Sequence, residues 1–201
     1  MSAMRIYKIN EIFYSLQGEG AHVGRASVFV RFAQCNLACA FCDTDFAHVA
    51  YRFNKNELES FVLALLEKEH VASKPQIVFT GGEPTLQLCE SEPILNGFYR
   101  CVETNGYKIA PSWIEWVTFS PKTKPIAADN MRRANEVKIL YSLFSDDEMI
   151  ALARDYPDKQ FFVQAIDDGQ RPISHDSLIL FCKRNPQFRL SLQTHKILEI
   201  R

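Results

Sequence analysis

Short apolar runs recur along the chain and predict the strands of a buried β-sheet. Several runs are continuous and rich in Val, Ile and Phe, which is typical of strands that are covered on both faces. The runs are SVFVRF (27–32), QIVFT (76–80), RCVET (100–104), WVTFS (116–120), EVKIL (136–140), FFVQAI (161–166) and RLSLQ (189–193). Strands of this composition are expected in a parallel sheet.

Helical spacing separates some of these runs. Between residues 56 and 69, apolar side chains recur at i, i+3, i+4, i+7 and i+8, and Asn54 or Asn56 can cap the first turn. Residues 146–154 and 174–183 have the pattern of shorter helices. Strands that alternate with helices predict an α/β fold built around a parallel sheet.

The length of the chain limits this architecture. Eight strand–helix units usually need about 250 residues, whereas the chain has 201. We therefore expect a single domain over residues 1–201, folded as a partial barrel. Such folds place their chemistry at the carboxyl ends of the strands, where polar residues also cluster in this sequence. The segments expected to converge on this rim are 35–45, 80–84, 103–106, 120–122, Gln164 and 193–196.

Charge and composition exclude some classes of function. The chain has 23 basic and 24 acidic residues, a net charge of −1, which argues against a general binder of nucleic acid or of anionic membranes. It opens without the pattern of a signal peptide, and no window reaches the roughly 18 apolar residues of a membrane span. We therefore expect a cytoplasmic protein, in which six cysteines are more often thiols or metal ligands than disulfides.

Three of the cysteines, Cys35, Cys39 and Cys42, lie within eight residues in the spacing C-x3-C-x2-C. Thiolates select zinc, copper(I) or iron–sulfur clusters, but structural zinc and closed clusters take four protein ligands. Three thiolates on a four-iron cluster leave one iron open, which the amino and carboxylate groups of S-adenosylmethionine could chelate. A Cys3His zinc site with His22 or His48, at spacings unusual for a zinc finger, and a set of unmetallated thiols are the alternatives.

A second motif, TGGEP (80–84), directly follows a predicted strand. Its two glycines let the amine of a ligand approach the backbone closely, and Glu83 can accept a hydrogen bond from an ammonium group. A plain strand-to-helix turn is the alternative, because Gly and Pro are common turn residues.

The two motifs together resemble those of the radical S-adenosylmethionine superfamily. That resemblance implies a [4Fe–4S] cluster on Cys35, Cys39 and Cys42. It also implies cofactor contacts from a wider set of residues, namely Phe41, Cys42, Asp43, Gly82, Glu83, Thr104, Asn105, Ser120, Pro121, Lys122 and Gln164.

The flanks of the chain narrow the family. EIFYSLQGEGAHVGRASVFVRFAQCNL (11–37), CDTDF (42–46) and RLSLQTHKILEIR (189–201) are similar to the 7-carboxy-7-deazaguanine synthase family. The resemblance implies a TIM-like, incomplete (β/α)6 barrel. It implies a ring-contracting lyase that converts 6-carboxy-5,6,7,8-tetrahydropterin to 7-carboxy-7-deazaguanine and ammonia for queuosine and other 7-deazapurines. The radical would remove the C6 hydrogen, and S-adenosylmethionine would be regenerated. Magnesium, a reductant such as flavodoxin and a homodimer are also implied.

Within this family, several residues are expected to bind substrate or magnesium. The guanidinium of Arg31 suits a carboxylate, and an exposed charge at a strand end is the alternative. The hydroxyl of Thr44 suits Mg²⁺, although an ordinary Asp/Thr turn is the alternative. The other expected substrate contacts are Leu16, Gln17, Gly18, Glu19, Thr80, His195 and Arg201. No side chain is assigned as an acid or base.

The sequence departs from the family pattern at three places. Gln34 precedes Cys35 where many relatives have glycine, residues 85–99 are less helical than usual, and Ala165 replaces a proline after Gln164.

Two other functions compete with the synthase. A glycyl-radical activating enzyme has the same cysteine spacing but acts on a protein, and a zinc-stabilised binding module would not be catalytic. QGEG (17–20) and QTHK (193–196) favour the small pterin substrate.

Overall fold

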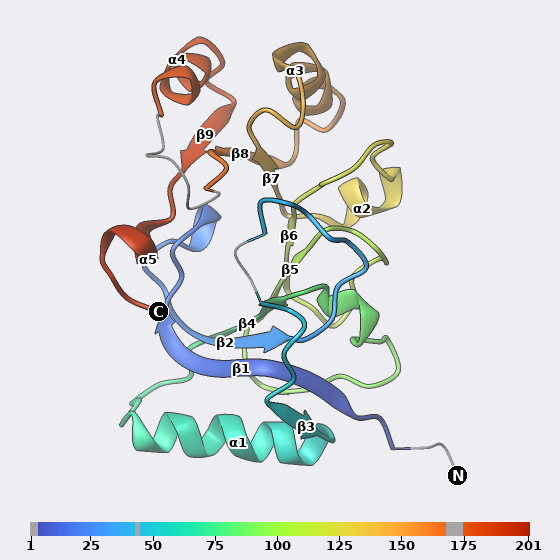
Figure 1. Ribbon diagram of the computed structural model, residues 1–201, viewed down its shortest axis with the longest axis vertical. Helices are drawn as coiled ribbons and strands as arrows, with labels where there is room; N and C mark the ends of the chain where they lie inside the picture. Colours follow the sequence, from blue (N-terminus) through green and yellow to red (C-terminus); the bar gives the residue numbers. More distant parts are fainter. Residues whose placement is uncertain (1–3, 43–44, 168–174) are drawn as a thin grey trace.

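One nine-stranded sheet runs through the computed structural model, which describes residues 4–42, 45–167 and 175–201 (Figure 1). The strands are β1 (Tyr7–Leu16), β2 (Ala26–Phe32), β3 (Tyr51–Phe53), β4 (Gln76–Gly81), β5 (Arg100–Thr104), β6 (Trp116–Phe119), β7 (Glu136–Leu140), β8 (Gln160–Gln164) and β9 (Phe188–Ser191). Their order is β3-β1-β2-β4-β5-β6-β7-β8-β9, and the described residues show no pairing between β3 and β9.

The seven predicted strands are the parallel part of this sheet. β2 and β4 to β9 pair in parallel, whereas β1 and β3 add an antiparallel edge. The prediction of an α/β partial barrel is confirmed. The sequence pattern missed β1 because a register shift between Ile9 and Glu11 interrupts its alternation.

The helices cover the outside of the barrel. They are α1 (Lys55–Lys68), α2 (Ala128–Arg133), α3 (Asp146–Asp155), α4 (Asp176–Arg184) and α5 (Thr194–Ile197), with 3-10 turns η1 (Gly20–His22) and η2 (Pro84–Leu86). In Figure 1, α1 lies along β1 at one end of the molecule, and α3 and α4 lie at the other. Within the described ranges no helix is long and apolar enough to cross a membrane.

Local sequence explains where the two best-predicted helices begin. Asn54 caps α1, since its side chain accepts from the Glu57 amide at 3.1 Å while the Glu57 carboxylate accepts from the Asn54 amide at 2.7 Å. Ser145 and Glu148 form the same capping box at α3. The predicted helix over 174–183 corresponds to α4, although Ser174 lies outside the described residues.

The connection from β4 to β5 carries η2 and, as its sequence suggested, no α-helix across residues 82–99, all of which are described. Leu88, Ile94, Leu95 and Phe98 from this connection are buried and join the core that packs α1 on the sheet. Each such side chain contributes about 1.5–3 kcal/mol on burial. The short segment therefore covers the barrel with apolar side chains where a helix would otherwise pack.

Candidate active site

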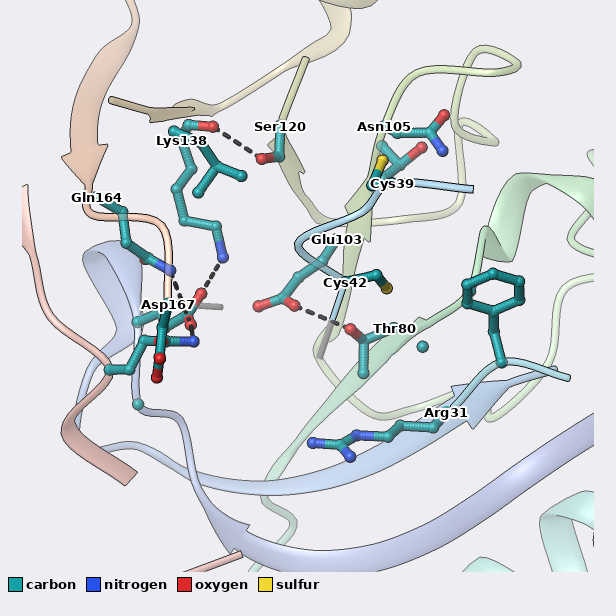
Figure 2. A pocket seen from close by; sticks show the side chains of 18 of the residues that line it. Arg31, Cys39, Cys42, Thr80, Glu103, Asn105, Ser120, Lys138, Gln164 and Asp167 are labelled. Atoms are coloured by element: carbon teal, nitrogen blue, oxygen red, sulfur yellow. Dashed lines mark hydrogen bonds and ion pairs between the residues drawn. The ribbon is translucent and has the colours of Figure 1, made fainter. Parts of the chain in front are cut away.

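A cavity of about 250 Å³ lies inside the partial barrel (Figure 2). It brings together most of the residues that the sequence predicted for the site. The predicted residues in its wall are Leu16, Gln17, Gly18, Glu19, Arg31, Cys35, Cys39, Phe41, Cys42, Thr80, Gly82, Thr104, Asn105, Ser120, Lys122, Gln164, His195 and Arg201.

Two of the predicted residues that the structure describes are not in that wall. Glu83 and Pro121 are buried behind it. Asp43, predicted to contact the cofactor, and Thr44, predicted to bind magnesium, lie outside the described residues.

The cysteine loop (residues 33–42) follows the carboxyl end of β2 and supplies three thiols to the cavity wall. The Cys42 amide donates to the Cys39 carbonyl at 3.1 Å, and the Leu37 amide lies 3.4 Å from the Cys35 sulfur. Burial raises the pKa of the Cys35 thiol. Three thiols that share one wall are the donor set of an iron–sulfur cluster with an open position.

A mononuclear zinc site that uses His22 as the fourth ligand does not fit this arrangement. His22 lies against Trp116, with ring centroids 4.5 Å apart, and its Nδ1 is 3.7 Å from the Cys101 sulfur. Cys101 and Trp116 stand at the amino ends of β5 and β6, so His22 is at the opposite end of the barrel from the cysteine loop. Within residues 4–42, 45–167 and 175–201, no three His, Cys, Asp or Glu side chains are placed to hold a metal ion.

The TGGEP segment packs tightly against the cysteine loop. Gly81 has φ +100, and a Cβ on Gly82 would lie 2.0 Å from the Gln34 carbonyl oxygen. Gln34 itself has φ +74, the left-handed region that favours glycine. Gly82 is therefore required by the contact with the cysteine loop, Gly81 by its own positive φ and its approach to Phe32, and Gln34 holds a conformation in which glycine would have no strain.

Glu83 ties together the loops that follow β4 and β5. Its buried carboxylate accepts from the Thr104 hydroxyl at 2.8 Å, the Asn105 amide at 2.7 Å and the Thr85 amide at 2.8 Å. The Asn105 side chain in turn lies 3.8 Å from the Cys35 sulfur. This carboxylate thus fixes the backbone on which the predicted cofactor contacts stand.

Arg31 lies at the edge of the cavity (Figure 2). The carbon of its guanidinium is 5.1 Å from the centroid of the Phe13 ring. Its guanidinium donates to Glu11 at 2.7 Å across the β1–β2 pair. Arg201 donates to the other oxygen of Glu11 at 2.6 Å and lies 5.2 Å from the same ring centroid. Two guanidinium groups around one carboxylate leave a net positive charge, which suits an anionic ligand.

Glu103 is a cavity residue that the sequence did not assign. Its carboxylate accepts from the Thr80 hydroxyl at 2.9 Å (Figure 2). It also accepts from the Gln17 side-chain amide at 3.0 Å. A carboxylate in this position can accept hydrogen bonds from N–H groups of a ligand.

Lys138 is a second unassigned residue, and it forms an ion pair with Glu19 inside the barrel. Burial alone would raise the pKa of Glu19, but the Lys138 ammonium and hydrogen bonds hold it at about 2. For Lys138, burial opposes the charged form, but the carboxylates of Glu19 and Glu103 outweigh it and raise its pKa. Glu136 and Lys138 are two residues apart in the apolar run EVKIL, so their side chains lie on the same face of the strand. Two charged residues on one face of a buried strand were the sequence signal that could have identified them.

Lys122 donates to the Ser120 hydroxyl at 2.7 Å on the rim beyond β6. Burial and the neighbouring charge of Lys138 lower the pKa of Lys122 to about 8. Ser120 also donates to the Lys138 carbonyl at 2.8 Å, which joins the ends of β6 and β7 (Figure 2).

Comparisons with known proteins agree with this geometry, although no model of a protein family matches the chain. A 7-carboxy-7-deazaguanine synthase of Bacteroides thetaiotaomicron is 38% identical over 96% of this chain and 98% of that protein. The protein of the same name from Bordetella pertussis is 38% identical over 96% of this chain and 99% of its own length. The crystal structure of QueE from Escherichia coli matches with a TM-score of 0.71 and 26% identity, covering 94% of each chain.

A partial α/β barrel with a three-cysteine loop after its first parallel strand defines a radical S-adenosylmethionine enzyme. Within that class, the identity and coverage of its relatives show that the chain belongs to the 7-carboxy-7-deazaguanine synthase family.

Proposed function

We propose that the chain converts 6-carboxy-5,6,7,8-tetrahydropterin to 7-carboxy-7-deazaguanine and ammonia, a step of 7-deazapurine biosynthesis that leads to queuosine. The observation that carries this proposal is a single cavity with the three cysteines on one wall and Arg31 with Glu103 on another. The names of relatives that match nearly the whole chain support it.

The substrate is proposed to lie between these walls. Arg31 binds its carboxylate, because a guanidinium can pair with a carboxylate through two parallel hydrogen bonds. Glu103 and the backbone of residues 16–19 face the pterin and offer hydrogen-bonding groups to its ring edge. Thr80, His195 and Arg201 complete this part of the wall.

The cofactors are proposed to lie toward the carboxyl ends of the strands. Cys35, Cys39 and Cys42 hold a [4Fe–4S] cluster, and Gly82, Asn105, Ser120, Lys122 and Gln164 are among the contacts of S-adenosylmethionine. When bound, this pair supplies the radical that removes a hydrogen atom from the substrate. The side chains of the cavity then have to bind the pterin, orient its C6 and exclude water.

Further partners are proposed from the family resemblance. Thr44 binds Mg²⁺, a flavodoxin-like protein supplies the electron, and the chain acts as a homodimer. One domain over residues 1–201 is supported by the single sheet. A reducing compartment such as the cytoplasm suits cysteines that are present as thiols.

An anaerobic turnover assay tests the function. The reconstituted chain is incubated with reductant, S-adenosylmethionine and the pterin, with and without added magnesium, and the product is identified by mass spectrometry. We expect 7-carboxy-7-deazaguanine, formed faster with magnesium. A chain that cleaves S-adenosylmethionine but forms none of this product would point to the glycyl-radical activating function instead. A chain that binds zinc and no iron would point to a non-catalytic module.

A further inference from the structure

The QGEG loop (residues 17–20) docks across the inside of the barrel onto strands that are distant in sequence. Leu16 pairs with Ala26, so the loop starts at the amino end of β2. The Gly20 amide donates to the Ser191 hydroxyl of β9 at 3.3 Å, and the next amide, from Ala21, donates to Glu136 of β7 at 2.8 Å. The loop therefore connects β2, the first strand of the parallel sheet, to β9, the last. These two strands do not pair with each other in the part of the chain that the structure describes, so the barrel is open between them.

The tail segment (residues 193–201) also contacts this loop. The amide and the hydroxyl of Thr194 both donate to the Gly18 carbonyl at 3.0 Å. A Cβ on Gly18 would lie 2.2 Å from the His195 ring nitrogen Nδ1 and 2.9 Å from the His195 amide nitrogen, so the two segments meet without space for a side chain.

Glu19 is the side chain through which the loop is fixed. One carboxylate oxygen accepts from Gln164 of β8 at 3.1 Å and from Gln193 at 3.0 Å. The other oxygen forms the ion pair with Lys138 of β7. With side-chain exposures of 13% for Glu19 and 8% for Lys138, this pair is shielded from solvent, and its attraction is weakly screened.

The Glu19–Lys138 ion pair affects the cavity because Glu19 is linked by hydrogen bonds to other residues of the cavity wall. The Glu19 amide donates to the side chain of Gln17 at 3.2 Å, and Gln17 donates to Glu103 at 3.0 Å. Gln17, Gly18 and Glu19 all line the cavity. A displaced Glu19 would therefore move the backbone of the cavity wall and the Gln17 amide that orients Glu103.

We propose that Lys138 is a positioning residue that acts through Glu19, holding the QGEG loop as the wall against which the pterin binds. The proposal rests on the proposed function for the identity of the ligand. Lys138 need not touch the substrate: its charge keeps the Glu19 carboxylate, and with it the loop, in the docked arrangement.

The test compares Lys138→Met with the wild-type holoenzyme. We expect KM for the pterin to rise about 10-fold to 100-fold, because the displaced loop no longer forms the wall against which the pterin binds, while iron content stays at the wild-type level. Hydrogen exchange of residues 17–25 should become faster. Lys138→Arg keeps the charge and should restore KM to within about threefold.

Arg100→Met is the matched control. Arg100 also forms a partly buried ion pair, with Glu115 at 2.7 Å and a side-chain exposure of 10%, but it lies outside the cavity wall. The Arg100→Met variant should have a lower free energy of unfolding and an unchanged KM for the pterin. A wild-type KM in Lys138→Met, or an equal rise in Arg100→Met, would overturn the proposal.

A double-mutant cycle with Glu19→Gln tests whether Lys138 acts through Glu19. Their effects on KM should be strongly non-additive, because either change removes the same ion pair. Additive effects would contradict the proposal. If Lys138→Met does not fold, Glu19→Gln and Lys138→Arg carry the test, with KM raised in the first and near wild type in the second. If the wild type binds the pterin but makes no 7-carboxy-7-deazaguanine, the proposed function fails, while pterin affinity and hydrogen exchange still decide the role of Lys138.

Discussion

The cysteine loop and the QGEG loop face the same cavity but are built differently. The Cys35 sulfur has long contacts, at 3.4 Å to the Leu37 amide, 3.8 Å to Asn105 and 3.9 Å to Asn36. The Glu19 carboxylate, by contrast, is engaged by a lysine and two glutamines from three segments of the chain. The first loop presents ligands for an external group, whereas the second uses its polar side chains to assemble the wall.

This difference ranks the expected effects of substitution. Loss of one of the three cysteines should remove chemistry and leave the fold, whereas a change in the QGEG loop should alter binding and stability together.

The largest effect is expected for Cys39→Ser. A hydroxyl is a poor ligand for iron in place of a thiolate, so the cluster of about four irons should be lost and product formation should fall below detection. Iron content per chain and the anaerobic assay measure this. Cys182→Ser is the control, because Cys182 is a free thiol of α4 outside the cavity wall. Equal iron in Cys39→Ser and the wild type would remove Cys39 from the cluster site.

The next effect concerns Arg31, which stands between the two loops. Arg31→Ala should keep the iron and weaken pterin binding by about 2–5 kcal/mol, because the substrate carboxylate loses its paired charge. Glu11→Gln should instead lower KM two- to threefold, roughly the strength of a partly exposed ion pair, because it frees Arg31 from an internal carboxylate. Calorimetric titration with the pterin distinguishes the two variants. An unchanged affinity in Arg31→Ala would exclude the carboxylate role.

Gly18→Ala tests the fit between the QGEG loop and the tail segment. The added methyl group would collide with His195, so we expect a loss of about 1–3 kcal/mol of unfolding free energy, together with a raised KM. Gly24→Ala is the control: nothing lies within 4 Å of its Cβ position, and its φ of +82 costs about 1–3 kcal/mol of stability, but KM should stay at the wild-type value. A Gly18→Ala variant as stable and as active as Gly24→Ala would argue against the tight contact.

The Glu19–Lys138 pair should also make stability depend on pH. The pKa of Glu19 is about 2 in the folded chain, against 4.5 for a free glutamate, so its stabilisation is complete above pH 4.5 and is lost as the pH falls toward 2. The difference in unfolding free energy between the wild type and Glu19→Gln should therefore shrink over this window in urea titrations. A difference that stays constant from pH 5 to about 2 would show that Glu19 is not held in its charged form.

The smallest effect is expected for Gln34→Gly in the cysteine loop. Because Gln34 has φ +74, glycine should relieve strain and raise unfolding free energy by up to about 1 kcal/mol, with unchanged iron content. Denaturant unfolding measures the gain. A clear loss of stability would mean that the Gln34 side chain contributes more than its backbone strain costs.

These two regions also show what the sequence could predict. The seven parallel strands and the helices α1, α3 and α4 were predictable because their apolar spacing is local. The bulged strand β1 and the six-residue helix α2 were missed, since neither shows a sustained period. The cysteine loop was predictable because thiols carry their chemistry in the residue type.

The contacts of the QGEG loop and of Glu103 were harder to predict from the sequence. Glu19 and Lys138 are 119 residues apart, and only the fold brings them together. The sequence predicted that Glu19 belongs to the site, but it could not show that its carboxylate is taken up by Lys138, Gln164 and Gln193. Glu103 was recognised as a rim residue, and its orientation by Thr80 and Gln17 likewise depends on the tertiary structure.

The most direct test of the central claim is an anaerobic crystal structure of the reconstituted chain with S-adenosylmethionine and the pterin bound. We predict a four-iron cluster on Cys35, Cys39 and Cys42, and the pterin between Arg31, Glu103 and the QGEG loop, with Glu19 still paired to Lys138. A pterin bound outside this cavity, or a cluster held by other residues, would contradict the account.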